Sequence, residues 1–433
     1  MEGNSIQNYI KELLENTPSE WLNLTTHRLD IYDESLAKSQ FLAQFEVLFS
    51  NKNTNTSALQ KLPTAYDYIR LGHPLSCVLE WSIAKLNNLK SENVISFSSQ
   101  TIPVLAILRT NLLAHKKTQI LYTGTLPSFF DADVLKRVYG YQFELKQIES
   151  TSAITQFDGS TVFIAQQNEL SLFELHKNCD FVIHNYGELG SVLAINGAQN
   201  NVYISDIQHV RRRETIAMTP ANTLTALKRL IGHAASETKT TDYKANKTLV
   251  LETIQKITGT NTTPLVGSSG LSIQYAIMMG LVHDALDTHP GKAIKIIVPP
   301  NCYGGTNDQA RRVAACLENV EVVDLLVDGA HDMVQSIELV LHAIAKEDAV
   351  PFIIAEIPTN PRVEVPDLLK LKAALSATRK TESGKTAIDP VFILDQTFCP
   401  NVLFLGEDEI LSAVRTISYV SGSKFPSGGK CTA

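Results

Sequence analysis

The segment Phe352-Ile353-Ile354-Ala355-Glu356 is a short apolar run that ends in a carboxylate. A second run of this kind, Val391-Phe392-Ile393-Leu394-Asp395, follows it, and the amphipathic segment 366–375 lies between the two. Apolar strands separated by amphipathic helices are typical of parallel strands buried on both faces of a sheet. Ligands of such sheets bind beyond the carboxyl ends of the strands. This part of the chain therefore predicts an α/β fold and directs attention to the polar residues that end its strands.

The same alternation extends over most of the chain. Strands are expected at 93–97, 118–122, 161–165, 180–184, 202–205, 263–266, 293–298, 320–325, 352–356, 391–395 and 416–420. Helical periodicity occupies 271–286, 308–317, 331–345 and 366–375, and residues 1–60 predict helices with a polar loop at 51–57. The pattern predicts a three-layer α/β fold with a mostly parallel sheet.

Short motifs recur in the two halves of the chain. Residues 97–100 resemble 266–270, Leu79-Glu80 resembles Leu251-Glu252, 163–166 resemble 353–356, and 181–184 resemble 392–395. We interpret them as two degenerate copies of one α/β unit, at 61–215 and 216–433, after an N-terminal helical segment at 1–60. The alternative is two unrelated stretches that share an α/β pattern.

Composition narrows the class of protein. The 433 residues contain 38 Lys and Arg against 45 Asp and Glu, a net charge of −7, which gives no basic footprint for nucleic acid. No apolar run of about 18 residues is present, and the N-terminus lacks the pattern of a signal peptide. The cysteines are scattered without CxxC spacing and predict neither a metal site nor a disulfide framework; they are Cys77, Cys179, Cys302, Cys316, Cys399 and Cys431. We expect a cytoplasmic protein without membrane or nucleic-acid partners.

Polar residues after the strands of the second half form an ordered set. Ser268-Ser269-Gly270-Leu271 opens a helix, where free N–H groups favour a phosphate, although such starts are usually only caps. Tyr303, freed by the following glycines, could stack on a flat ring, or could simply be an exposed turn residue. Asn360 lies between Pro358 and Pro361 and could hydrogen-bond a phenolate oxygen.

The last two members of the set are a carboxylate and a lysine. Asp395 could keep a pyridine nitrogen protonated, or could merely cap a loop. Lys424, within Ser421-Gly422-Ser423-Lys424, is an amine whose pKa desolvation would lower, as a Schiff-base lysine requires. Taken alone, a lysine near glycines is usually a surface residue.

The order of these motifs, from phosphate loop to aromatic residue, Glu-x-Pro-x-Asn-Pro, Asp and Ser-x-Ser-Lys, resembles the Cys/Met metabolism family of pyridoxal-phosphate enzymes. This family includes cystathionine synthases and lyases and has the aspartate-aminotransferase fold (fold type I). The resemblance covers residues 266–433 and departs from the family pattern at Leu271, Ser423 and Phe425. Gly305 stands where methionine γ-lyases carry cysteine, which argues against that member.

The resemblance implies a role for each residue. Ser269, the backbone amides of Gly270 and Leu271, and the hydroxyls of Ser421 and Ser423 would hold the phosphate of pyridoxal 5′-phosphate. Tyr303 would stack on its ring and move protons, Asn360 would contact the phenolate oxygen, and Asp395 would pair with the ring nitrogen. Lys424 would form the Schiff base and move the Cα proton of a sulfur-containing amino-acid substrate. The resemblance implies elimination or replacement at Cβ or Cγ without choosing between them.

The first copy resembles another part of the family. Tyr68-Ile69-Arg70-Leu71-Gly72-His73-Pro74 looks like the segment whose tyrosine and arginine reach the partner subunit's cofactor phosphate. The copy has Gln100 for the phosphate-loop glycine, His184 for Asp395 and Gln208 near the lysine position. In the second copy, Thr240 and Asp242 stand where Tyr68 and Arg70 would be.

These complementary losses suggest an internal pseudo-dimer in which Tyr68 and Arg70 complete the pocket around Lys424. The alternatives are a homo-oligomer, in which they serve a second chain, or a decayed first copy that acts as scaffold.

Two function classes follow. The first is a pyridoxal-phosphate lyase or transferase of sulfur amino-acid metabolism, and the second is a non-catalytic scaffold or partner subunit of the same fold. The C-terminal small domain of the family is expected to be missing, because the sequence ends nine residues after Lys424. Motifs of other classes, GxGxxG, GxxxxGK[ST] and GxSxG, are not found.

Overall fold

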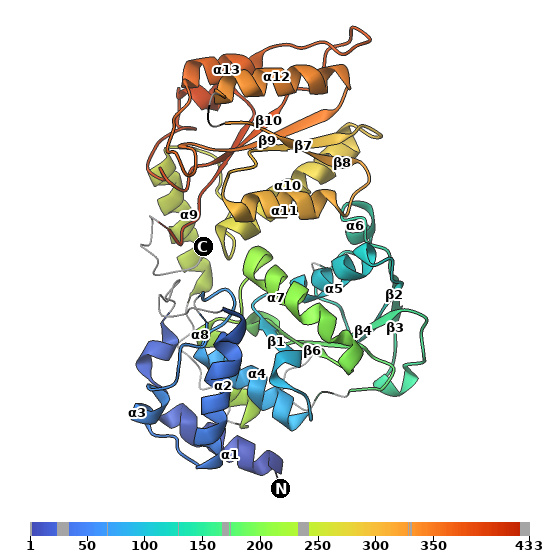
Figure 1. The fold of residues 1–433 in the computed structure, drawn as a ribbon, viewed down its shortest axis with the longest axis vertical. Coiled ribbons are helices and arrows are strands. Elements are labelled where there is room, and N and C mark those ends of the chain that lie inside the picture. Colours follow the sequence, from blue (N-terminus) through green and yellow to red (C-terminus); the bar gives the residue numbers. More distant parts are fainter. Residues whose placement is uncertain are drawn as a thin grey trace. The chain divides into compact units, whose positions relative to one another are not determined.

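The computed structural model describes residues 2–23, 34–66, 68–128, 130–166, 173, 175–232, 242–327, 329 and 331–424. These residues form two compact units, the first within 1–136 and 141–240 and the second within 137–140 and 241–428. Each unit contains one sheet with helices on both of its faces (Figure 1). The expected α/β class is confirmed, with two mostly parallel sheets.

The first unit has a six-stranded sheet in the order β1-β6-β5-β4-β2-β3. Strand β6 is antiparallel to both of its neighbours, and the other pairs are parallel. Its strands are β1 (Val94–Phe97), β2 (Thr118–Thr123), β3 (Glu144–Gln147), β4 (Ser160–Gln166), β5 (Phe181–Asn185) and β6 (Ser191–Ile195). Its α-helices are α1 (Glu2–Glu15), α2 (Glu34–Ser50), α3 (Thr56–Leu59), α4 (Pro74–Leu86), α5 (Ile102–Leu113), α6 (Ala132–Arg137), α7 (Tyr203–Glu214) and α8 (Pro220–Leu230).

Helix α4 is the centre of the apolar core on one face of this sheet. It begins at Pro74 after His73, whose ring accepts the Ser76 N–H in a capping box. The helix packs against α8, α2 and α1, and its apolar residues share one cluster with Val94, Val182 and Val192 of the sheet. The N-terminal helices therefore cover α4 and belong to the same core.

A buried ion network crosses this core. Glu80 of α4 is fully buried, and its carboxylate lies 2.6 Å from the Lys38 amine and 2.8 Å from the Arg211 guanidinium. The N–H and hydroxyl of Ser96 also donate to it, each at 2.8 Å. The network connects α2, α4, α7 and β1. It satisfies a buried charge that would otherwise be costly.

The second unit has a five-stranded sheet that is parallel throughout, in the order β11-β10-β9-β7-β8. Its strands are β7 (Ile294–Val298), β8 (Val320–Asp324), β9 (Val350–Glu356), β10 (Val391–Asp395) and β11 (Thr416–Tyr419). Its helices are α9 (Tyr243–Thr258), α10 (Gly270–Thr288), α11 (Gly304–Ala314), α12 (Met333–Lys346) and α13 (Leu368–Ser376). Short 3₁₀ helices of the chain are η1 (Ser19–Leu22), η2 (Ser91–Asn93), η3 (Thr151–Ala153), η4 (Gly187–Leu189), η5 (Ala198–Val202) and η6 (Ile410–Ala413).

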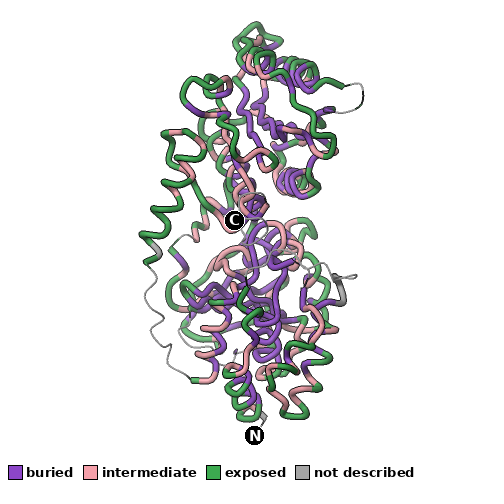
Figure 2. Tube along the Cα trace, turned by 90° about the vertical axis from the view of Figure 1, so that its left-hand side faces the viewer, coloured by how far each residue is buried: buried purple, intermediate pink, exposed green. Residues whose placement is uncertain are grey.

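Helices cover both faces of the second sheet, α12 and α13 on one side and α10 and α11 on the other (Figure 1). Strands β9 and β10 are buried along their whole length, as a parallel strand between two helical layers requires. Ile353 and Phe392 pack against Ile337 of α12 in one apolar cluster. Helix α9 is different, because most of its described residues are exposed (Figure 2).

Most predicted helices and strands of the second half are confirmed, with ends shifted by a few residues. The strand expected at 263–266 is wrong, because this segment is irregular. Pro264 has no N–H to give to a ladder, and Leu265 is 84% exposed.

The strand expected at 202–205 is also wrong, because helix α7 begins at Tyr203. The buried residues Tyr203, Ile207 and Val210 recur with helical spacing, which outweighs the short apolar run. Gln208 therefore lies inside a helix and does not occupy a lysine position after a strand. Strands β3 and β6 were not predicted.

The predicted match of His184 with Asp395 is corrected by strand register. Asp395 pairs with Glu356, whereas His184 pairs with Ala165 and the residue beside Gln166 is Asn185. If 163–166 match 353–356, the counterpart of Asp395 is Asn185. It is fully buried, and the structure gives its amide no hydrogen-bond partner among the described residues.

Candidate functional site

The carboxyl edge of the second sheet brings three polar side chains side by side. Glu356 of β9 pairs with Asp395 of β10, which in turn pairs with Tyr419 of β11. Paired residues of neighbouring parallel strands point to the same face of a sheet. All three residues are buried, with 6%, 8% and 7% of their surfaces exposed. They form a polar row at the edge where parallel sheets bind ligands.

Asp395 is held at both carboxyl oxygens. Its Oδ1 accepts the Thr397 N–H at 2.9 Å, and its Oδ2 lies 2.9 Å from the Tyr419 hydroxyl. Burial raises the pKa of Asp395, and the hydrogen bonds from Thr397 and Tyr419 oppose that rise. The carboxyl group is therefore fixed in direction by its neighbours.

Glu356 connects two residues that the sequence analysis selected. Its Oε1 accepts the N–H of Tyr303 at 2.9 Å, and its carboxylate also interacts with the backbone of Asn360. Burial raises the pKa of Glu356 to about 7, and the nearby charge of Asp395 adds to the rise. The buried carboxylate thus holds the start of α11 and the Pro-rich loop after β9 at the same edge.

The predicted phosphate loop and the lysine loop lie against each other. A Cβ atom on Gly270 would lie 2.9 Å from the Cβ of Ser421, so the two loops approach at a place that only glycine allows. Ser421 donates its N–H to the hydroxyl of Thr397 at 3.0 Å. These contacts join the start of α10, the lysine loop and the Asp395 loop in one place.

The N-terminus of α10 is built as a capped helix start. Ser269 and Ser272 form a capping box, in which the Ser269 hydroxyl accepts the Ser272 N–H at 3.1 Å. The Ile273 N–H donates to the Ser269 carbonyl at 3.1 Å, the first i to i−4 bond of this helix. The N–H groups of Gly270 and Leu271 precede it and point out of the helix start.

The lysine loop follows β11 directly. The hydroxyls of Ser421 and Ser423 lie 2.9 Å apart, and the Lys424 N–H donates to the Ser421 carbonyl at 3.2 Å. Lys424 is half-buried, and Phe425 lies outside the described residues. The backbone of Lys424 is therefore anchored to the residue that touches Gly270.

Tyr68 and Arg70 belong to the first unit. Tyr68 is 3% and Arg70 4% exposed, and the Arg70 guanidinium carbon lies 4.3 Å from the centre of the Tyr68 ring. Arg212 approaches the same ring at 5.4 Å. Thr240 lies outside the described residues, and Asp242 caps helix α9 by accepting the Ala245 N–H. The predicted role of Tyr68 and Arg70 at Lys424 stays a prediction.

Sequence reasoning missed several residues of this site. Thr397, Tyr419 and Gln274 were not selected, and Glu356 was quoted only as part of a motif. Parallel register could have indicated Tyr419, because residues that end adjacent strands become neighbours. Gln274 lies four residues after Gly270, and its amide oxygen accepts the Tyr419 hydroxyl at 2.7 Å.

The residues fit a phosphorylated pyridine cofactor. A phosphate requires several hydrogen-bond donors in one place. The donors here are the outward N–H groups of Gly270 and Leu271 and the hydroxyls of Ser421 and Ser423, which lie beside one glycine. Asp395 supplies a buried acid at the carboxyl edge, as a ring nitrogen requires. The donor set and the acid come from loops that contact each other through Thr397.

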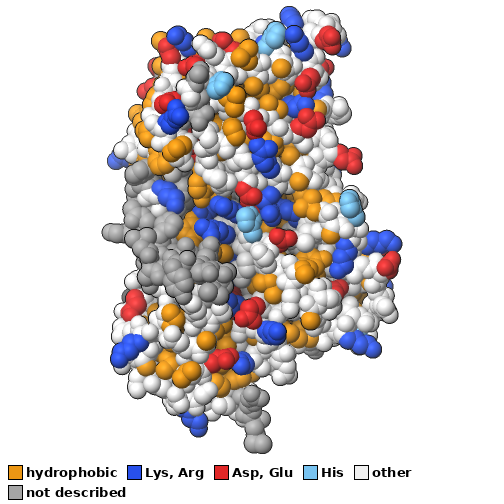
Figure 3. Space-filling view, in the orientation of Figure 1, with side chains coloured by type: hydrophobic (Ala, Val, Ile, Leu, Met, Phe, Trp, Pro, Cys, Tyr) orange, Lys and Arg blue, Asp and Glu red, His pale blue; other side chains and the backbone are white. Residues whose placement is uncertain are grey.

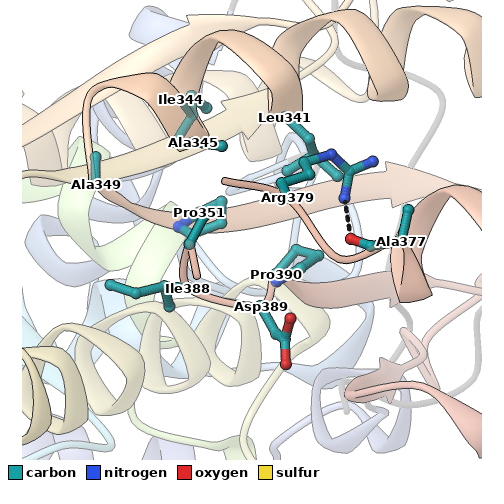
Figure 4. A pocket seen from close by; sticks show the side chains of 11 residues that line it. Leu341, Ile344, Ala345, Ala349, Pro351, Ala377, Arg379, Ile388, Asp389 and Pro390 are labelled. Carbon is teal, nitrogen blue, oxygen red and sulfur yellow. Dashed lines mark hydrogen bonds between the residues drawn. The ribbon is translucent and has the colours of Figure 1, made fainter. Parts of the chain in front are cut away.

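A small cavity elsewhere in the second unit does not belong to this site. It is lined by Leu341 and Ile344 of α12, Pro351 and Pro390, and the Arg379 side chain, which donates to the Ala377 carbonyl (Figure 4). Pro351 and Pro390 stand at the amino ends of β9 and β10, opposite to Glu356 and Asp395.

The surface of the second unit carries mixed charges. Basic and acidic side chains are interspersed over its visible face, in the upper part of Figure 3. Exposed pairs such as Arg311 and Asp324, 2.7 Å apart, contribute to this mixture. No helix in the described part of the chain is long and apolar enough to cross a membrane.

Comparisons with known proteins find distant structural similarity only. No protein-family model matches the chain, and no curated protein matches it. Cystathionine gamma-lyase from yeast aligns with 14% identity and a TM-score of 0.29, covering 46% of this chain and 62% of its own. The protein metB from Corynebacterium glutamicum aligns with 13% identity and a TM-score of 0.29, covering 46% and 61%. Mouse CSAD aligns with 15% identity and a TM-score of 0.31, covering 43% and 40%. This chain spans less than two thirds of the length of each.

Proposed function

We propose that this chain binds pyridoxal 5′-phosphate at the carboxyl edge of its second sheet and acts on sulfur-containing amino acids as a lyase or transferase. The observation that carries the proposal is the close approach of Gly270 to Ser421. It joins the predicted phosphate loop to the loop of Lys424, and Thr397 extends the contact to Asp395. The order of motifs in the sequence supports the same assignment.

Each residue has a defined task in this proposal. The amides of Gly270 and Leu271 and the hydroxyls of Ser421 and Ser423 bind the phosphate. Asp395 pairs with the ring nitrogen, Asn360 donates to the phenolate oxygen, and Tyr303 covers the ring. Bound pyridoxal 5′-phosphate withdraws electrons from the Cα atom of an amino acid. Lys424 attaches the cofactor through its amine and moves the proton at Cα.

Cofactor attachment is tested with the purified full chain. Incubation with pyridoxal 5′-phosphate, borohydride reduction and peptide mass spectrometry should locate a pyridoxyl group on Lys424. The variant Lys424→Ala should lose the modification, whereas Lys346→Ala, which removes an exposed lysine of α12, should keep it. A pyridoxyl group on scattered surface lysines would contradict the proposal.

Turnover is tested separately. Pyruvate and homocysteine released from cystathionine would identify elimination at Cβ, and 2-oxobutyrate and cysteine would identify elimination at Cγ. A chain that is modified at Lys424 but releases none of these products would exclude a lyase and leave a transferase, or the non-catalytic scaffold or partner subunit.

A further inference from the structure

Three buried polar side chains, Tyr419, Gln274 and Thr306, are linked by hydrogen bonds to Asp395. The Tyr419 hydroxyl lies 2.9 Å from Asp395 Oδ2 and 2.7 Å from Gln274 Oε1. The Thr306 hydroxyl lies 2.9 Å from the same Gln274 oxygen. Gln274 and Thr306 are at most 1% exposed. Because these contacts are closed to solvent, each needs a proton from the groups themselves.

If Asp395 is ionised, these groups carry too few protons to place one in each oxygen–oxygen contact. Three oxygen–oxygen contacts link Asp395, Tyr419, Gln274 and Thr306 in series, and the Thr306 hydroxyl also interacts with Tyr419. Tyr419 and Thr306 carry only one hydroxyl proton each. If Tyr419 donates to an ionised Asp395, its oxygen faces Gln274 Oε1 at 2.7 Å without a proton between them. If Asp395 donates to Tyr419, then Tyr419 donates to Gln274, and all three contacts are filled.

The orientation of the Gln274 amide supports this count. Its Nε2 lies 3.4 Å from the carbonyl oxygen of Thr306 and donates to it. Rotating the amide would let Gln274 donate to Tyr419, but it would place Oε1 against the Thr306 carbonyl, two acceptors facing each other. The orientation with Oε1 toward Tyr419 is therefore favoured.

Other titratable groups near Asp395 do not remove the need for a proton. They are Glu356 on β9, Tyr419 on β11, Cys302 before α11 and Cys399 after β10. Glu356 is the second carboxyl group of the row and opposes a charge on Asp395. Glu356 Oε1 and Asp395 Oδ1 each accept a backbone N–H, which favours the ionised form of both groups equally. Of the two carboxyl groups, Asp395 is the one in contact with a hydroxyl that also has a second acceptor.

We infer that Tyr419 and Gln274 are positioning residues that keep Asp395 protonated in the cofactor-free protein. Asp395 donates to Tyr419, and Tyr419 donates to Gln274. When a neutral pyridine nitrogen of the cofactor meets Asp395, this proton passes from the carboxyl group to the nitrogen and leaves a carboxylate paired with a pyridinium, a step that rests on the proposed function. The protonation of the free chain does not rest on it.

The experiment is infrared spectroscopy of the cofactor-free full chain across a pH series. At neutral pH we expect a carboxylic-acid C=O band that disappears in Asp395→Asn and remains in Glu356→Gln. In Gln274→Met, Tyr419 becomes free to donate to the ionised carboxylate. The titration midpoint of the Asp395 band should then fall by about one pH unit or more.

Gln309→Met is the matched control. Gln309 is a second buried glutamine, but its amide donates to the Leu271 carbonyl at 3.0 Å, so the midpoint should stay in place. The inference is overturned if wild type shows no Asp395-dependent band at neutral pH, or if Gln274→Met leaves the midpoint unchanged or raises it. Should Gln274→Met fail to fold, the comparison of wild type with Asp395→Asn still decides. A chain that binds no cofactor leaves this spectrum unaffected, so the two proposals can fail separately.

Discussion

Gly270 and Ser421 approach so closely that a Cβ atom on the glycine would lie 2.9 Å from the Cβ and 3.1 Å from the Cα of the serine. Real Cβ atoms essentially never lie within 3.0 Å of another heavy atom, so the two loops would have to separate to admit a side chain. The start of α10 and the loop of Lys424 therefore keep their mutual position because residue 270 has no side chain.

Gly270→Ala should weaken pyridoxal 5′-phosphate binding by about tenfold or more, since it moves Ser421 away from the N–H groups of α10. Equilibrium titration monitored by absorbance measures this. Gly280→Ala in the same helix is the control, because no described atom lies within 4 Å of its added Cβ. It should leave the affinity unchanged and stabilise the helix by roughly 0.5–1 kcal/mol. Equal affinity in both variants would contradict the shared phosphate site.

Glu356→Gln should change how stability depends on pH. The folded-state pKa of Glu356 is raised from 4.5 to about 7, so the folded chain binds this proton more tightly than the unfolded chain. The stability that this proton contributes is fully present below the unfolded-state pKa and is lost as pH rises through about 7. Relative to Glu356→Gln, wild type should lose up to about 3 kcal/mol of unfolding free energy over this range.

Urea unfolding of both proteins at several pH values between about 4.5 and 8 tests this. Glu382→Gln, which changes an exposed glutamate of the same unit, is the control and should follow wild type. If the unfolding free energies of wild type and Glu356→Gln depend on pH in the same way, the pKa of Glu356 is not raised by folding.

Strands β9 and β10 were predictable because each is a buried apolar run that ends in a carboxylate. The row formed by Glu356, Asp395 and Tyr419 was not, because it depends on how far each strand extends along its neighbour. The contact between Tyr419 and Gln274 depends in addition on how α10 packs on the sheet. The sequence pattern predicts neither the register of the strands nor the packing of α10.

The errors in the first half have a related cause. Residues 202–205 contain a short apolar run, but the buried positions continue with helical spacing to Glu214, so this segment forms helix α7. Strand β6 escaped prediction although it is fully buried, because its five residues are too few to distinguish strand from helix by periodicity. Its antiparallel pairing with β1 and β5 is a property of the sheet and leaves no local signal.

Glu80→Gln should destabilise the first unit by about 3–5 kcal/mol, because it leaves Lys38 and Arg211 buried without their carboxylate. Burial opposes the charge of Glu80, but Lys38 and Arg211 lower its pKa from 4.5 to about 2. The stability that the Glu80 carboxylate contributes is therefore present above its unfolded-state pKa and is lost as pH falls toward 2. Urea unfolding at neutral and acidic pH should show a difference from wild type that shrinks in acid.

The control for this network is Asp158→Asn. The Asp158 side chain is 99% exposed and lies 3.5 Å from the Lys117 amine, so its loss should change stability very little. A similar small effect for Glu80→Gln would mean that the buried network can rearrange around a neutral amide.

Arg70→Ala tests whether the first unit completes the site around Lys424. If the chain is an internal pseudo-dimer, the loss of this guanidinium should weaken pyridoxal 5′-phosphate binding about tenfold or more, since an arginine fork matches a phosphate. Arg212→Ala is the matched control, because Arg212 approaches the same Tyr68 ring at 5.4 Å but is not part of the predicted phosphate segment. Both variants lose a cation–π contact with Tyr68, so the control accounts for the loss of that contact.

The dependence of binding on protein concentration distinguishes one chain from two. A pseudo-dimer completes its site within a single chain, so the fraction of protein that binds cofactor should not change on dilution. A homo-oligomer in which Arg70 serves a second chain should lose cofactor on dilution, together with its assembly. Equal affinity of wild type and Arg70→Ala at every concentration would leave the first unit as a scaffold, because a phosphate ligand cannot be removed without cost to binding.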